Sequence, residues 1–114
     1  MNITIHSNPQ LNLPIKIGNV SYISGEAGPA LLGILLAEKD FVPPASQELI
    51  VHADVLDKHE NLIFSCETLP ATSFFFSGGM VVFQLNFASY KHLFNLVKIH
   101  EIKLYPALRD YTPE

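Results

Sequence analysis

The chain has 114 residues, 48% of them hydrophobic and only 16% charged, and its formal net charge is −4. This length suits one domain that buries a core without disulfides or metals. The seven Lys and Arg residues are scattered singly. That argues against nucleic acid and anionic membrane surfaces as partners, because both are bound by clustered basic side chains.

A single cysteine, Cys66, excludes an intrachain disulfide and fits a reducing compartment. The N-terminal segment lacks the basic stretch and apolar core of a secretory signal. The longest apolar run, residues 30–37, is far shorter than a membrane span. We therefore expect a soluble, cytoplasmic protein, and no motif in the chain indicates a cofactor.

Short strands separated by turn signals account for the first half of the chain. Residues 2–6 form the first predicted strand, and Ile15 and Ile17 begin the second. At Gly18-Asn19 the apolar positions change phase. This predicts either a two-residue hairpin loop, which we prefer, or a bulge within one longer strand. Residues 30–37 are apolar on all sides, as in a buried helix or a central strand. We predict a strand because the neighbouring segments are strands.

Residues 48–67 carry the clearest alternation in the chain. Apolar side chains occupy every second position of two consecutive segments, namely Leu49, Val51, Ala53 and Val55, then Leu62, Phe64 and Cys66. The polar residues 57–61 separate the segments, and Asn61 suits a left-handed turn position. This pattern predicts an antiparallel hairpin with one buried face.

The last third of the chain reads as three further strands. The first is residues 74–76, followed by Gly78-Gly79 as a turn or bulge. The second has a core face of alternating apolar side chains: Val81, Phe83, Leu85 and Phe87. Residues 96–105 form the last strand, which Pro106 is expected to end. We thus expect one domain over residues 1–106 and a polar tail over residues 107–114.

The number and spacing of these segments define the predicted fold class. Turn signals recur at roughly the 8–12-residue spacing of all-β sandwiches. We therefore predict a single-domain antiparallel β-sandwich, immunoglobulin-like or jelly-roll, with or without one short helix.

An apolar surface outside the core is the main functional indication. Because side chains alternate across a strand, Phe75 is expected to lie opposite Phe74 and Phe76. Four other apolar side chains fall on the less apolar sides of their strands: Ile50, Ile63, Met80 and Val82. These five residues predict a non-enzymatic interaction module that self-associates as a homo-oligomer or docks on a larger protein partner. Alternatively, residues 30–37 cover this surface within the monomer.

A small-ligand or carbohydrate-binding module is the alternative function. Tyr22 and Tyr105 are expected near the ends of the sandwich, where aromatic rings can stack on a ligand. The chain has no Trp, which weakens the carbohydrate interpretation.

A metal-dependent enzyme is the third possibility. His52 and Asp54 lie two apart on the polar face of one strand, so both point the same way. A third ligand would have to come from one of three other histidines, His59, His92 or His100. Cys66 shares the apolar face of its strand and is expected to be inert rather than nucleophilic.

Overall fold

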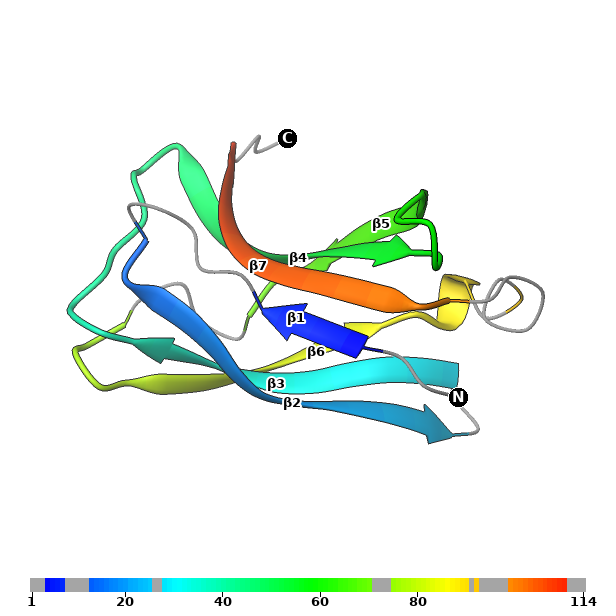
Figure 1. Ribbon diagram of the computed structural model, residues 1–114. Coiled ribbons are helices and arrows are strands. Elements are labelled where there is room, and N and C mark those ends of the chain that lie inside the picture. The colour runs from blue at the N-terminus through cyan, green and yellow to red at the C-terminus, as the bar shows by residue number, and fades with distance from the viewer. Residues whose placement is uncertain are drawn as a thin grey trace.

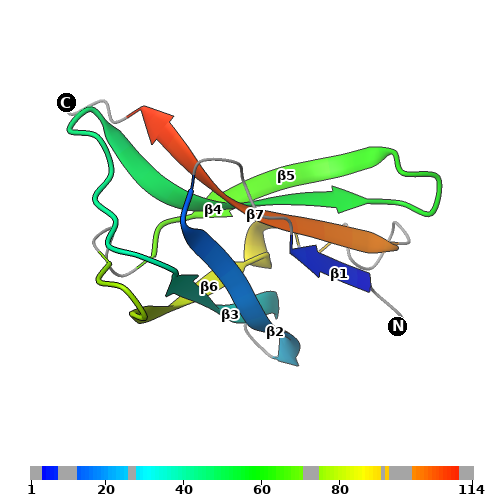
Figure 2. The same ribbon diagram turned by 60° about the vertical axis from the view of Figure 1, so that its left-hand side comes forward.

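The computed structural model describes residues 4–7, 13–25, 28–70, 75–90, 92 and 99–110. Within them the strands are β1 (Thr4–Ser7), β2 (Ile15–Gly25), β3 (Gly28–Ala37), β4 (Gln47–Leu56), β5 (Leu62–Thr68), β6 (Met80–Asn86) and β7 (Glu101–Asp110), with one 3-10 turn, η1 (Ala88–Tyr90). They form a four-stranded sheet, β1-β7-β4-β5, and a three-stranded sheet, β2-β3-β6. The sheets pack face to face, as Figure 1 and Figure 2 show. The predicted β-sandwich is confirmed.

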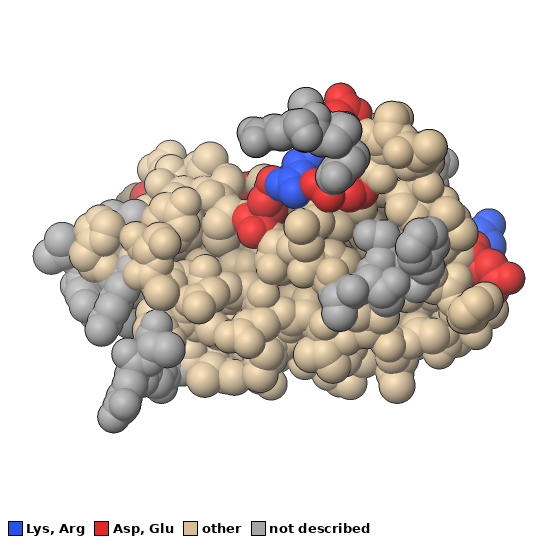
Figure 3. Space-filling model, turned by 180° about the vertical axis from the view of Figure 1, so that it is seen from behind, with Lys and Arg blue, Asp and Glu red and all other residues tan. Residues whose placement is uncertain are grey.

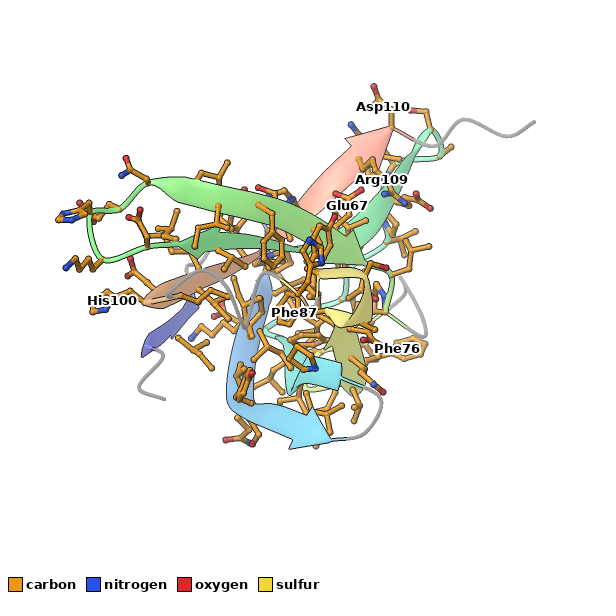
Figure 4. The ribbon with its side chains drawn as sticks, turned by 90° about the vertical axis from the view of Figure 1, so that its right-hand side faces the viewer. Glu67, Phe76, Phe87, His100, Arg109 and Asp110 are labelled. Carbon is orange, nitrogen blue, oxygen red and sulfur yellow. The ribbon has the colours of Figure 1, made fainter. Side chains whose placement is uncertain are left out.

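The core fills the space between the two sheets. It is built from alternate positions of the strands, with buried apolar side chains from β6 and the residue after it: Phe83, Leu85 and Phe87. Figure 4 shows Phe87 between the sheets. The inward side chains of the predicted alternation in β4 are also fully buried: Leu49, Val51, Ala53 and Val55. Fully burying one large apolar side chain contributes roughly 1.5–3 kcal/mol. This alternation therefore determines which side of each strand faces inward.

The preferred hairpin at Gly18-Asn19 is wrong, and the bulge is right. β2 continues through these residues and pairs with β3 over its whole length, with a register shift between Gly18 and Ser21. Asn19 adopts a positive φ of 50°, a conformation that Asn tolerates better than most residues. In an unbroken strand Ile17 and Tyr22 would point to opposite faces, because they are an odd number of residues apart. The extra residue of the bulge reverses the alternation, so both side chains pack against the core.

Residues 30–37 form a strand, as predicted. β3 is the central strand of its sheet, with β2 on one side and β6 on the other. Its inward side chains, among them Leu31 and Leu35, are fully buried. Gly33 also faces inward, where the ring of Phe83 lies so close that a Cβ on Gly33 would come within 2.8 Å of it. The glycine thus makes room for the ring.

Two predictions in the last third of the chain are wrong. Residues 75–76 are not in a strand; Phe75 makes only an isolated bridge to Phe41, and Phe74 lies outside the described residues. Pro106 does not end the last strand, because β7 continues to Asp110 and pairs with β4 throughout. β1 pairs with β7 only as far as Leu104. Beyond that point no described strand pairs with this side of β7, and a missing N–H is tolerated at such a position.

The domain boundary moves accordingly. Residues 107–110, expected in the polar tail, belong to the four-stranded sheet, and the rest of the expected tail lies outside the described residues. The pairing of β1 with β7 is parallel, whereas the other strand pairs are antiparallel as predicted.

The hairpin between β4 and β5 is confirmed, with one difference in its turn. Asp57 C=O accepts from the Glu60 N–H (3.1 Å), and the Asp57 carboxylate accepts from the N–H groups of His59 (2.8 Å) and Asn61 (2.9 Å). The residue with positive φ is Glu60, at 64°, rather than Asn61. A side chain with a Cβ is strained there, and Gly is the residue that usually fills such a position in a hairpin.

We expect Gly33→Ala to destabilise the fold. The overpacking against Phe83 costs about 1–3 kcal/mol, which outweighs the ~0.5–1 kcal/mol that Ala gains over Gly in a strand. Urea unfolding measures the difference. Gly18→Ala is the control, because its Cβ would meet no atom closer than 3.9 Å. Equal stability of the two variants would contradict the role of Gly33.

Relief of the strained turn is expected to stabilise the protein. Glu60→Gly should raise the free energy of unfolding by about 0.5–1 kcal/mol, since Gly adopts positive φ without a Cβ clash. The control is Glu60→Ala, which removes the same charge but keeps the Cβ. A comparable gain in both variants would assign the effect to charge instead. Thermal unfolding of the three proteins decides between these results.

Candidate functional site

The outer face of the four-stranded sheet carries a polar network centred on Asp54. Ser65 Oγ donates to Asp54 Oδ1 at 2.7 Å, and His52 Nε2 lies 2.8 Å from the same oxygen. The Tyr105 hydroxyl donates to Asp54 Oδ2 at 3.5 Å. The His52 and Tyr105 rings lie against each other, with centroids 4.9 Å apart. Side chains from β4, β5 and β7 are thereby linked.

The surroundings of Asp54 shift its acidity. Partial burial raises the pKa of its carboxyl, but the hydrogen bonds from Ser65, His52 and Tyr105 act in the opposite direction and together hold the pKa below its ordinary value. Asp54 is therefore a carboxylate that accepts hydrogen bonds and not a proton donor at neutral pH.

Arg109 makes a second link across the same face. Its guanidinium pairs with Glu48 on β4, where Nε lies 2.9 Å from Oε1, and with Glu67 on β5. Figure 4 shows Arg109 and Glu67 beside each other above the sheet. Because Arg109 lies opposite Glu48, and Glu67 lies opposite His52, the bridge from β7 to β5 crosses β4 at Ile50. Ile50 is only 4% exposed although it points outward, as expected under an arginine side chain.

The structure places His52 and Asp54 on one strand face, as predicted, but they bond to each other. Within the described part of the chain, no group of three His, Cys, Asp or Glu side chains could hold a metal ion. The three histidines considered as further ligands, His59, His92 and His100, are exposed. The network therefore cross-links strands, and the described residues provide no metal site.

Cys66 is half-buried and packs against the core, on the inner face of β5. Burial, followed by the nearby charges of Glu67 and Asp54, raises the pKa of its thiol to about 12. A thiol that stays protonated is a poor nucleophile. This agrees with the expectation that Cys66 is inert.

Three of the five predicted interface residues are not on an open surface. Phe75 is 4% exposed and belongs to the core cluster, because no strand exists there to turn it outward. Ile50 is covered as described above. Ile63 lies where the β4–β5 register shifts and packs, half-buried, against the core. The other two, Met80 and Val82, are 66% and 64% exposed.

Met80 and Val82 lie on the outer face of the three-stranded sheet, together with other apolar side chains. The register places Leu36 beside Met80 and Ile34 beside Val82. The full set, which we call the apolar face, is Ile23, Leu32, Ile34, Leu36, Met80 and Val82. Lys16 and Glu38 form an ion pair of 2.7 Å at its rim. In Figure 3 the charged side chains in view gather at the top, over the four-stranded sheet, and toward the right-hand edge, whereas the described residues in the lower part are not Lys, Arg, Asp or Glu.

Sequence reasoning missed the members of the apolar face on β2 and β3. The signal was present, because residues 30–37 are apolar on both sides, but a central strand was expected to be covered on both. Phe76, near this sheet in Figure 4, adds a further exposed aromatic ring, with 82% of its surface accessible.

The two tyrosines predicted to bind a ligand do not form one site. Tyr22 is half-buried on β2 and packs against the core, whereas Tyr105 belongs to the polar network on the opposite sheet. An open depression of about 240 Å³ is lined by Leu13, Pro14, Glu38 and Lys39, and neither tyrosine contributes to it.

No protein-family model matches the chain, and neither curated proteins nor solved structures show a significant similarity to it. In the part of the chain that the structure describes, no helix is long and apolar enough to cross a membrane.

The lowered pKa of Asp54 makes a prediction for acid stability. Its stabilising effect is complete above the unfolded-state pKa of about 4 and is lost as the pH falls through the lower folded-state pKa. We expect Asp54→Asn to lose about 1 kcal/mol at pH 7 and to show a shallower loss of stability below pH ~4 than the wild type. Urea unfolding between pH 3 and 7 measures both. Asp110→Asn retains Asp54 and should keep the wild-type pH dependence; an identical slope in both variants would refute the assignment.

Proposed function

We propose that this protein is a non-enzymatic assembly module that self-associates through its apolar face. The observation that carries the proposal is the exposure of Met80 and Val82 beside Leu36 and Ile34 on one sheet. Large apolar patches on a protein surface mark sites of association. The proposed setting is the cytoplasm, with which the single protonated thiol of Cys66 is compatible.

The contrast between the two outer faces supports this choice. On the four-stranded sheet, charged and hydroxyl side chains bond to one another and to Arg109 across three strands. That face has its polar groups satisfied and its one large apolar residue in the middle, Ile50, covered. On the three-stranded sheet the outward positions of β3 are apolar, and Met80 and Val82 beside them on β6 are exposed. A sheet normally has one face in the core and a polar face in water. The apolar face departs from this rule, and contact with a partner would remove its exposed apolar side chains from water.

A second copy of the chain is the partner that the charge distribution favours. The apolar face has no net charge, since Lys16 and Glu38 at its rim pair with each other. Two copies can therefore meet in a symmetric contact without placing like charges together. A partner with a strong opposite charge would instead be attracted to the rest of the surface, which carries the net charge of −4.

The apolar face is too small to hold two copies tightly by itself. Three strands at ~4.8 Å spacing and seven residues at ~3.3 Å give a projected area of roughly 330 Å², less than the roughly 800 Å² per partner in a standard interface. Apolar burial at about 25 cal/mol per Å² must also overcome the entropic cost of association. Stable assembly therefore requires a further contact.

Val82→Asp is expected to abolish self-association while the domain stays folded. Placing an unpaired carboxylate in the contact weakens association by at least about 30-fold, equivalent to ~2 kcal/mol. Size exclusion with light scattering measures the mass, and circular dichroism checks the fold. The matched control is Leu62→Asp, because Leu62 is 59% exposed and lies on β5 in the other sheet. It should retain the wild-type mass.

A wild-type protein that is monomeric at every concentration would refute the proposal. Loss of assembly in both Asp variants would show that the effect is one of charge and not of the apolar face. Phe75→Asp is expected to unfold the protein, since Phe75 is in the core, and it is therefore unsuitable as an interface variant.

A further inference from the structure

The edges of the two sheets differ in how they are protected. Of the described strands, β1, β5, β2 and β6 lie at sheet edges. β1 has only four residues, β5 carries Glu67, and β2 carries Lys16 and a bulge. Short length, charge and bulges are the devices by which natural proteins prevent edge pairing. β6, with the sequence MVVFQLN, has seven residues, no charge, no Pro and no register shift.

The hydrogen bonds at the two ends of β6 show which backbone groups point to the edge on which no other described strand pairs. The Ala37 N–H donates to Gly79 C=O (3.0 Å), and the Phe87 N–H donates to Pro29 C=O (2.8 Å). Opposed residues in an antiparallel ladder alternate between bonded and non-bonded pairs, so the odd-numbered residues of β6 bond to β3. The even-numbered residues therefore direct their N–H and C=O groups away from β3: Met80, Val82, Gln84 and Asn86.

We propose that β6 pairs antiparallel with β6 of a second copy, in a register centred on Phe83. Val82 then lies opposite Gln84 of the second copy, and Met80 lies opposite Asn86 of the second copy. In this register all the outward backbone groups of β6 find partners. Both members of every pair also face the same side of the sheet, so core-facing side chains meet core-facing ones. No like charges meet, because β6 has none.

Edge pairing supplies the contact that the apolar face lacks. It joins the two three-stranded sheets into one continuous sheet, and it places two apolar faces side by side as one surface of twice the area. Two such dimers can then stack through these surfaces into a closed assembly of four chains. This inference rests on the proposed self-association and specifies its geometry.

Gln84→Pro tests the edge without altering the apolar residues. Proline at this position removes an N–H that points to the open edge and leaves the bonds between β6 and β3 in place. We expect the mass measured by light scattering to fall from that of four chains to that of one, because a single apolar face is too small to hold two copies without edge pairing, and the circular dichroism spectrum should be retained. The matched control is Gln84→Thr, which keeps the N–H and should keep the wild-type mass. An unchanged mass in Gln84→Pro would overturn edge pairing and leave the proposed function standing.

Ile23→Glu separates the apolar face from the edge. Ile23 belongs to the apolar face but lies on β2, and β3 separates it from β6. This variant is expected to remain an edge-paired dimer, and combining it with Gln84→Pro should give a monomer. A wild-type dimer that Gln84→Pro dissociates and Ile23→Glu does not would support edge pairing and refute the stacked faces. Complete dissociation by Ile23→Glu alone would overturn the inference.

Amide hydrogen exchange gives a readout that oligomer mass does not. In the wild type, we expect exchange at the Val82 N–H to be slowed by at least about tenfold relative to the Gln84→Pro variant. The N–H groups of Val81 and Phe83, which bond to β3, should be protected in both proteins. If Val82 exchanges equally fast in both while its neighbours stay protected, the edge is open and the inference is overturned.

Discussion

The central position of β3 is the constraint on which the rest of this structure depends. It is hydrogen-bonded on both sides, to β2 and β6, and it is apolar on both faces. Its inward face packs against the other sheet, and the absent side chain of Gly33 admits the ring of Phe83. Its outward face meets no described element, and Leu36 and Ile34 extend the exposed apolar residues of β6. The same strand thus builds the core and creates the surface from which we infer assembly.

The outer face of the four-stranded sheet is polar, unlike that of the three-stranded sheet. Its outward positions on β4 alternate with the core positions, as they do on β3, but most carry charge or hydrogen-bonding groups. Asp54 collects donors from its own strand and both neighbouring strands, and Arg109 spans three strands to reach Glu67. These links cover Ile50, which on its own would be an apolar residue in water. The polar network therefore links the strands of this sheet across its outer face.

An unprotected edge strand next to an apolar face is a combination that soluble monomers avoid, because either feature promotes association. Here the two features share the same residues. Met80 and Val82 present apolar side chains on the outer face and, by the alternation of the ladder, backbone groups that point away from β3 at an edge where no other described strand pairs. A single strand can thus serve two contacts at right angles to each other, which suits a closed symmetric assembly.

The sequence by itself determined the fold class and the inward side of β4, β5 and β6. Alternation over Glu48 to Leu56 and over Val81 to Phe87 was sufficient, because side-chain direction in a strand is a local property with period two. The strand at residues 30–37 followed from its neighbours.

What the sequence could not determine was which face or edge another element covers. Pro106 was expected to end a strand, but β1 is too short to pair with β7 at that point, so the missing N–H is tolerated. Ile50 was expected to be exposed, but it is buried at the point where the bridge from Arg109 to Glu67 crosses β4. Phe75 was expected on an open face, yet it bridges Phe41 and joins the core. In each case the deciding contact is between residues distant in sequence, and only the tertiary structure brings them together.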